Sequence, residues 1–402
     1  MVKANKRLLA LFFVSVIDIL GFGILVPLVP YMGDRFGVPA QWITPILGAY
    51  SLFQFLSAPL WGRLSDRYGR RLILMTSLSG ACVSYVMLGL ADNVWWLVAS
   101  RILGGFMAGN IAAAFAYASD VSEPRNRAAS LGLIGAAIGI GFTVGPAVGG
   151  VLAGNDITTA NFVRPATVSA CLSLLAIALV AFVLPESHTA ALRNQNASRS
   201  RSGALQLLLE RPSLRFIACA ALLVTSSQSM LESIFAIWAL NKFGYGPRTV
   251  GLLLFCFASL AVLTQGGLVR ALVPRLGEPR LAALGILAYA AGLVLVGEAP
   301  TWMMTAVGLA LCGIGTGAFS PSASALASRQ SNDHDRGAVM GTYQASSSLA
   351  RVIGPFVSGP VYAAFGPSAP YLLGALVALP AVWFVWRVRA QSSISVSKID
   401  TA

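Results

Sequence analysis

The chain of 402 residues is 56% hydrophobic and only 11% charged, and it carries a formal net charge of +13. Its mean hydropathy of +0.74 excludes an ordinary soluble domain, in which roughly 25% of the residues are charged. A soluble core of this size has no use for so much apolar surface, so the composition indicates a protein that lies in a lipid bilayer.

The apolar residues fall into twelve continuous runs, each close to or above the roughly 20 residues that a helix needs to cross the hydrocarbon core. Because the runs are continuous and not alternating, they favour helices over a β-barrel. The sequence predicts membrane spans at about 7–32, 43–61, 72–91, 94–119, 128–153, 163–185, 214–241, 248–270, 280–298, 301–327, 337–364 and 370–388.

The basic residues indicate how the chain is oriented. Most of the 28 lysines and arginines lie at the N-terminus or in the loops that follow the even-numbered spans. The opposite loops hold Arg35, Arg164, Lys242 and Arg248. Since cytoplasmic loops are enriched in Lys and Arg, both termini are predicted to be cytoplasmic. The same placement explains the positive charge without a nucleic-acid partner.

The chain is predicted to consist of two similar halves. We expect an N-terminal six-helix bundle over 1–185, a cytoplasmic linker over 186–213, a C-terminal six-helix bundle over 214–390 and a cytoplasmic tail over 391–402. DRYGRR after the second span corresponds to PRLGEPR after the eighth, and GPAVGG in the fifth span corresponds to GPFVSGP in the eleventh. The predicted fold is therefore all-α, with twelve transmembrane helices in two pseudo-symmetric bundles, as in alternating-access carriers.

The loop after the second span, GRLSDRYGRR (62–71), combines glycines with an acid and several bases. Gly62 permits two helix ends to approach closely, and Gly69 permits a tight turn. Asp66 and Arg70 can pair at i, i+4, with Asp120 near the end of the fourth span as a third member. The candidate gate comprises Gly62, Asp66, Arg67, Gly69, Arg70 and Asp120. The alternative is that the basic residues only set the topology.

The fifth span contains the small-residue pattern GFTVGPAVGG (141–150). Its glycines allow close helix contact, and the proline removes one backbone hydrogen bond and can bend the helix. A conformational role is expected for Gly141, Gly145, Pro146, Gly149 and Gly150, with ordinary helix packing as the alternative.

Four charged residues lie inside predicted spans: Asp18 and Arg101 in the first half, and Glu232 and Arg351 in the second. An unpaired charge costs about 2.5–3.5 kcal/mol at a helix centre on insertion scales. Such residues are tolerated when they face a water-filled cavity, where Asp18 or Glu232 can exchange a proton. The alternative is a pair of static ion pairs that hold helices together.

These motifs resemble those of a known family. GRLSDRYGRR resembles the loop between helices two and three of the major facilitator superfamily, and RILGGFMAG (101–109) resembles its fourth-helix motif. GFTVGPAVGG resembles the fifth-helix motif of the drug:H+ antiporter branch, and DILGFGILVPLVP resembles the first helix of tetracycline efflux proteins. The resemblance implies that the helices of the four charges line a central cavity.

The chain departs from the tetracycline exporters in two places. Ser84 stands where their third helix carries an aspartate, and the predicted ninth helix also lacks their acid. Because those exporters bind a magnesium chelate, the missing acids argue against tetracycline as the substrate.

We therefore expect a transporter and not an enzyme. The glycine-rich GIGTG (313–317) lies inside a span and lacks a following GK[ST], and neither an HExxH nor a CxxC motif occurs, so no cofactor or metal is expected. The resemblance implies proton-coupled efflux of small amphipathic or drug-like compounds across the inner membrane by a monomer, with the substrate, protons and the bilayer as its partners. The alternatives are an exporter of an endogenous metabolite such as a sugar or siderophore, an uncoupled facilitator, or a membrane sensor.

Overall fold

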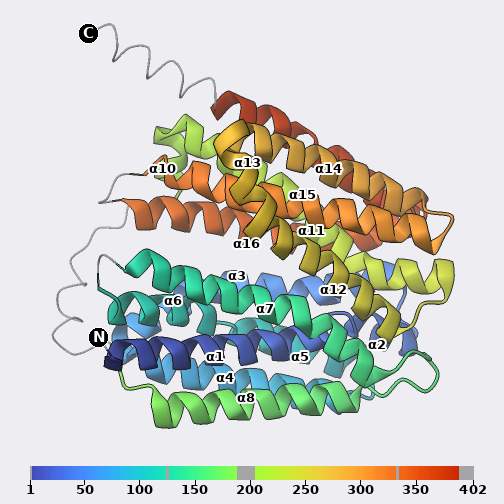
Figure 1. Ribbon diagram of the computed structural model, residues 1–402. Helices are drawn as coiled ribbons and strands as arrows, with labels where there is room; N and C mark the ends of the chain where they lie inside the picture. The colour runs from blue at the N-terminus through green and yellow to red at the C-terminus, as the bar shows by residue number, and fades with distance from the viewer. Residues whose placement is uncertain (1, 124–125, 188–203, 332–334, 389–402) are drawn as a thin grey trace, which may run out of the picture. The chain divides into compact units, whose positions relative to one another are not determined.

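The computed structural model describes residues 2–123, 126–187, 204–331 and 335–388, and these residues are almost entirely helical (Figure 1). Within them, 11 helices are long and apolar enough to cross a membrane. A further helix, α16 (Arg336–Phe365), has 30 residues but a centre rich in serine. The prediction of an all-α protein with twelve membrane-length helices is confirmed.

The first six spans are continuous or once-broken helices. They are α1 (Val2–Leu25) with α2 (Val29–Arg35), α3 (Ala40–Tyr68), α4 (Arg70–Gly89), α5 (Val94–Met107) with α6 (Asn110–Val121), α7 (Arg127–Ala153) and α8 (Val163–Val183). These bounds lie within a few residues of most of the predicted spans.

The remaining six spans follow the short helix α10 (Ala204–Glu210). They are α11 (Pro212–Phe243), α12 (Pro247–Leu263) continued by the π-helical turn η1 (Thr264–Leu268) and α13 (Val269–Leu276), α14 (Glu278–Glu298), α15 (Trp302–Ser328), α16, and a last span that starts with α17 (Ala369–Ala378). The eighth span is thus longer than the prediction, because α13 continues it through an amphipathic turn rich in arginine.

The chain forms two compact units. Unit 1 comprises residues 1–199 and 239–255, and unit 2 comprises residues 200–238 and 256–402. The end of α11 and the start of α12 therefore pack with the first six spans. The predicted linker 186–213 stays a prediction, because most of it lies outside the described residues.

The two units repeat the same helix contact. In unit 1, α7 packs on α1, and a Cβ added to Gly145 would lie 2.6 Å from the Cα of Gly23. In unit 2, α16 packs on α11, and a Cβ added to Gly354 would lie 2.6 Å from the Cβ of Ser229. Gly145 and Gly354 hold the same position in GPAVGG and GPFVSGP, so the repeat in sequence is also a repeat in packing.

The fourth span is broken between α5 and α6. Gly109 fills the break, where an added Cβ would lie 2.2 Å from the Cγ of Trp61. A broken helix leaves carbonyl groups without partners, and side chains must satisfy them inside a membrane. The indole of Trp61 donates to the carbonyl of Phe106, and the hydroxyl of Ser77 donates to the carbonyl of Met107. The break is therefore a stable feature of unit 1.

Candidate functional site

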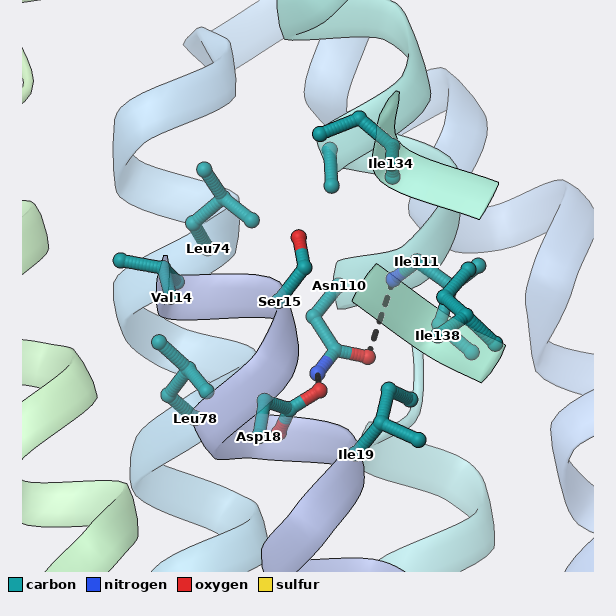
Figure 2. A pocket seen from close by; sticks show the side chains of 11 residues that line it. Val14, Ser15, Asp18, Ile19, Leu74, Leu78, Asn110, Ile111, Ile134 and Ile138 are labelled. Carbon is teal, nitrogen blue, oxygen red and sulfur yellow. Dashed lines mark hydrogen bonds between the residues drawn. The ribbon is translucent and has the colours of Figure 1, made fainter. Parts of the chain in front are cut away.

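Asp18 is buried in the middle of α1, inside unit 1. It lines a small pocket of about 10 Å³, close to the smallest space that holds one water molecule. Figure 2 shows its carboxyl group directed at Asn110, with Ser15 one turn earlier and aliphatic side chains around them. The residues that line the pocket are Val14, Ser15, Asp18, Ile19, Leu74, Leu78, Asn110, Ile111, Ala114, Ile134 and Ile138.

The break in the fourth span presents Asn110 to this carboxyl group. The side-chain amide of Asn110 donates to Oδ2 of Asp18, and its Oδ1 accepts from the backbone N–H of Ile111 at 3.0 Å. Its own backbone N–H donates to Ser77 at 3.0 Å. The partner of Asp18 is thus a neutral amide. Asn110 was not among the predicted site residues, although a Gly–Asn pair in the middle of a span indicates a break in the helix.

Arg101 lies in the same unit but is not bonded to Asp18. It is 2% exposed, and its Nε and Nη2 atoms have no hydrogen-bond partner among the described residues. Tyr50 and Tyr85 lie close enough to both Asp18 and Arg101 to interact with their charges. Asp18, Asn110, Tyr50 and Tyr85 also line a second small pocket. The structure therefore brings the two charges into one polar region without an ion pair between them.

The two charges of unit 2 are exposed. Glu232 on α11 accepts a hydrogen bond from the amide of Gln228 at 2.8 Å. Arg351 on α16 acts electrostatically on Glu232, but no ion pair within 4.0 Å joins them. The hydroxyl of Ser229 donates to the carbonyl of Arg351 at 3.2 Å, which fixes the contact between the two helices. Neither predicted charge pair is thus a closed ion pair in the part of the chain that the structure describes.

The candidate gate is centred on Arg70, the first residue of α4. Its guanidinium lies 2.7 Å from the carboxylate of Asp66 and 3.2 Å from that of Asp120, and it donates to the hydroxyl of Ser65 at 2.9 Å. The Ser187 hydroxyl also donates to Asp120, at 3.3 Å. Arg70 is buried, so these bonds compensate a charge that has lost water. The cluster of Asp66, Arg70 and Asp120 forms as predicted, while its role as a gate stays a prediction.

Two predicted gate residues lie outside this cluster. The guanidinium of Arg67 lies over the ring of Tyr68, 5.3 Å from its centroid. No described atom of unit 1 lies within 4 Å of the place that a Cβ on Gly62 would take, so the close approach predicted at Gly62 is not made within this unit. The ends of α3 and α4 meet instead at Gly69.

Gly69 makes the turn between α3 and α4 together with Glu186, which the sequence analysis missed. Gly69 has φ +105°, a conformation that favours glycine. The next two residues are Arg70 and Arg71, and their backbone N–H groups donate to the Glu186 carboxylate at 2.8 and 3.2 Å. A Cβ on Gly69 would lie 2.4 Å from that carboxylate. Glu186 therefore caps the N-terminus of α4, where negative charge is favourable.

The glycines of the fifth span pack directly on the first. A Cβ on Gly149 would lie 1.9 Å from the carbonyl oxygen of Ile24, and Cβ atoms on Gly141 and Gly145 would lie 2.8 and 2.6 Å from atoms of α1. Since α1 carries Asp18, this stripe of glycines fixes the helix that presents the buried carboxyl group.

Gly150 and Pro146 lie against the start of α12, which belongs to unit 1. A Cβ on Gly150 would lie 2.4 Å from the carbonyl oxygen of Pro247, and a Cβ on Gly251 would lie 2.3 Å from that of Pro146. Pro146 lies inside α7, which runs without interruption from Arg127 to Ala153. The motif GFTVGPAVGG therefore brings α7 into close contact with both α1 and α12.

Ser84, which stands in place of the acid of tetracycline exporters, is buried, and its hydroxyl has no hydrogen-bond partner among the described residues. It lies beside Gly104, where a Cβ would be 2.7 Å from the Ser84 hydroxyl. Within the described residues, no group of three or more His, Cys, Asp and Glu side chains is arranged to hold a metal ion.

Membrane-length helices in two units, with a broken span, buried charges and internal pseudo-symmetry, are typical of multi-pass transporters. The family model of the Major Facilitator Superfamily matches residues 11–278 and 217–400. The chain belongs to the major facilitator superfamily.

Individual relatives agree with this assignment. The chain is 29% identical to the tetracycline resistance protein, class C, of Escherichia coli, with 94% of this chain and 97% of that protein covered. It is 29% identical to multidrug resistance protein 2 of Bacillus subtilis (strain 168), with 85% and 84% covered. The crystal structure of the human organic anion transporter MFSD10 matches with a TM-score of 0.71 at 22% identity, over 95% of this chain and 99% of that one. The two sequence relatives are thus resistance proteins, and the matching structure is that of a transporter.

Proposed function

We propose that this protein is a proton-coupled efflux transporter that exports small amphipathic or drug-like compounds by alternating access. Asp18 is the proton-coupling residue. The observation that supports this role is its bonding: the buried carboxyl group meets the neutral amide of Asn110, while Arg101 keeps donors without partners in the same unit. If Asp18 and Arg101 served only to hold helices together, their side chains would form an ion pair with each other. No such pair links these two residues.

The physical reason for coupling is the cost of a buried charge. An ionised carboxylate in apolar surroundings is expensive, whereas the protonated group is not. A conformational change that alters how much water reaches Asp18 must therefore alter its proton occupancy, which links proton movement to the transport cycle. Glu232, which lies on α11 of unit 2, is the second candidate for proton coupling.

The class of substrate is supported by the relatives named above for tetracycline and multidrug resistance. The serine at position 84 and the interior of the ninth span, which lacks acids between Glu278 and Glu298, favour drug-like compounds other than a tetracycline chelate. The placement of Lys and Arg supports an inner-membrane location with cytoplasmic termini. Because one chain contains both units, we propose that a monomer carries out the cycle.

The test uses energised everted membrane vesicles that contain the protein and a fluorescent pH probe. Addition of norfloxacin or ethidium is expected to release protons from wild-type vesicles. Asp18→Asn should abolish this release, while Asp34→Asn, an exposed acid on α2, should leave it unchanged. Substrate movement without proton release in the wild type would identify an uncoupled facilitator. Normal proton release with Asp18→Asn would rule out Asp18 as the coupling residue.

A further inference from the structure

The face of unit 2 formed by α11 and α16 carries two exposed charges in the middle of membrane-length helices. Glu232 and Arg351 are both exposed. The backbone carbonyl of Arg351 accepts a hydrogen bond from Ser229, and its guanidinium interacts electrostatically with Glu232 without an ion pair within 4.0 Å between them. Lipid is a poor environment for such groups, and charges within spans face a protein interior or water. This face therefore borders a wet space where a polar ligand can replace water on both charges.

The contacts between the two helices hold these charges in fixed positions. The Ser229 hydroxyl bonds to the Arg351 carbonyl at 3.2 Å, and the hydroxyls of Ser233 and Ser358 lie 2.9 Å apart. The side chain of Glu232 is further oriented by the amide of Gln228 at 2.8 Å. A carboxylate and a guanidinium that interact electrostatically without forming an ion pair present two opposite charges on one face.

The rest of the α16 face adds polar contacts. Gln344 and Ser348 precede Arg351 at helical spacing on one stripe, and Gln344 is exposed. The exposed apolar side chains Leu349, Ile353 and Phe356 lie on the opposite side of α16 from Arg351. The part of α16 beside Arg351 is therefore polar.

We propose that this face of unit 2 is a substrate subsite for amphoteric amphipathic compounds, in which Arg351 binds the acidic group of the substrate and Glu232 binds its basic group. A guanidinium presents paired donors that match a carboxylate, and a carboxylate accepts from a protonated amine. The inference rests on the proposed function of the protein as an exporter of small amphipathic compounds, and it specifies their charge pattern.

The test compares three related probes on the purified full-length protein. Norfloxacin carries a carboxylate and a basic piperazine, its ethyl ester keeps only the basic group, and N-acetylnorfloxacin keeps only the acid. Equilibrium binding without a proton gradient should rank norfloxacin as the tightest ligand. Arg351→Gln should lower the affinities for norfloxacin and N-acetylnorfloxacin by about 10- to 100-fold, which is the range for the loss of a charge-assisted hydrogen bond. The affinity for the ester should stay within about twofold.

Glu232→Gln should produce the opposite pattern, with weaker binding of norfloxacin and the ester and unchanged binding of N-acetylnorfloxacin. Arg351→Lys, which keeps the charge, should recover part of the affinity and also serves if Arg351→Gln unfolds. Arg270→Gln, an exposed arginine on α13, is the matched control and should change none of the three affinities.

The proposal is overturned if Arg351→Gln changes the affinities for the acid and the ester by the same factor. It is also overturned if the wild-type protein binds the ester as tightly as norfloxacin, or binds none of the probes. These outcomes are independent of proton coupling, because binding is measured at equilibrium and Asp18→Asn should leave the ranking of the probes unchanged. Failure of the subsite and failure of the proposed transport cycle are therefore distinguishable.

Discussion

At the scale of single residues, Arg70 joins three segments that are far apart in the sequence. Its side chain bonds to Asp66 at the end of α3 and to Asp120 at the end of α6, and its backbone N–H bonds to Glu186 after α8. A buried guanidinium with several acceptors strongly favours the arrangement that supplies them. Movement of any one of these helix ends must therefore break a charged contact, which is what a latch requires.

Replacing Asp66 tests this latch. Asp66→Asn removes one charge of a partly exposed pair, so we expect a stability loss of only about 0.5–1 kcal/mol. If the pair stabilises one conformation of the cycle, that energy shifts the conformational balance, and transport should fall roughly two- to fivefold at equal protein levels. Arg67→Gln, one residue along the same turn, should have little effect because Arg67 lies over Tyr68 instead. Transport assays on vesicles with matched expression distinguish a latch role of Asp66 from a topological one. Equal effects of the two substitutions would leave both residues with a topological role.

Glu186 is expected to contribute to stability and transport as much as the residues of the loop 62–71 do. Glu186→Ala removes the acceptor for the backbone N–H groups of Arg70 and Arg71, and losing such a cap costs about 0.5–2 kcal/mol. The melting temperature of the purified protein and its transport rate should both decrease. Glu123→Ala, an exposed acid near the end of α6, is the control and should leave both unchanged. An unaltered melting temperature for Glu186→Ala would contradict the capping role.

At the scale of helices, hydropathy located most of the spans, because a membrane helix must be apolar over most of its length; the serine-rich centre of α16 makes this signal weaker there. It did not reveal the break in the fourth span or the partner of Asp18. Asn110 is defined by a tertiary contact with α1, and Glu186 by a contact with α4, and neither contact leaves a periodic signal in its own segment. The pairing of Asp66, Arg70 and Asp120 was predictable in part, since two of the three are one helical turn apart.

The repeat between the units preserves a pairing but reverses its charges. In unit 1, Arg70 at the start of α4 pairs with Asp120 at the end of α6 at 3.2 Å. In unit 2, Glu278 at the start of α14 pairs with Arg329 at the end of α15. The position at the start of the helix is basic in unit 1 and acidic in unit 2, and the position at the end of the partner helix shows the reverse. An ion pair therefore ties the third span to the fourth, and the ninth to the tenth, with either polarity.

Two kinds of glycine in α7 should respond oppositely to a methyl group. Gly149→Ala places a Cβ 1.9 Å from the carbonyl oxygen of Ile24, and forcing the helices apart is expected to cost about 1–3 kcal/mol. In Gly139→Ala, the added Cβ has no atom within 4 Å. The substitution also removes a flexible residue from the helix, so it should stabilise the protein by about 0.5–1 kcal/mol. Thermal unfolding of the two variants in the same detergent measures the difference. Equal melting temperatures would show that α1 and α7 are not held by this close contact.

At the scale of the whole molecule, each half of the chain contributes to unit 1. The segment 239–255 follows the linker in the sequence but packs with the first six spans. The Tyr31 hydroxyl donates to the carbonyl of Tyr245 at 2.8 Å, and the carbonyl of Gly154 accepts from the backbone N–H of Arg248 at 3.1 Å. Unit 1 is therefore complete only when residues from beyond the linker are present.

This composition of unit 1 predicts that the two halves assemble without a covalent link. Co-expression of residues 1–195 with residues 196–402 should give a complex that copurifies and transports, because segment 239–255 attaches the second piece to the first. Gly251→Leu should weaken the copurification, since even a Cβ at this position would lie 2.3 Å from the carbonyl oxygen of Pro146. Gly266→Leu, in the same span but with no atom within 4 Å of an added Cβ, should leave assembly intact. If both variants copurify as well as the unmodified pieces, the packing of segment 239–255 does not hold the halves together, and the association must come from other helices.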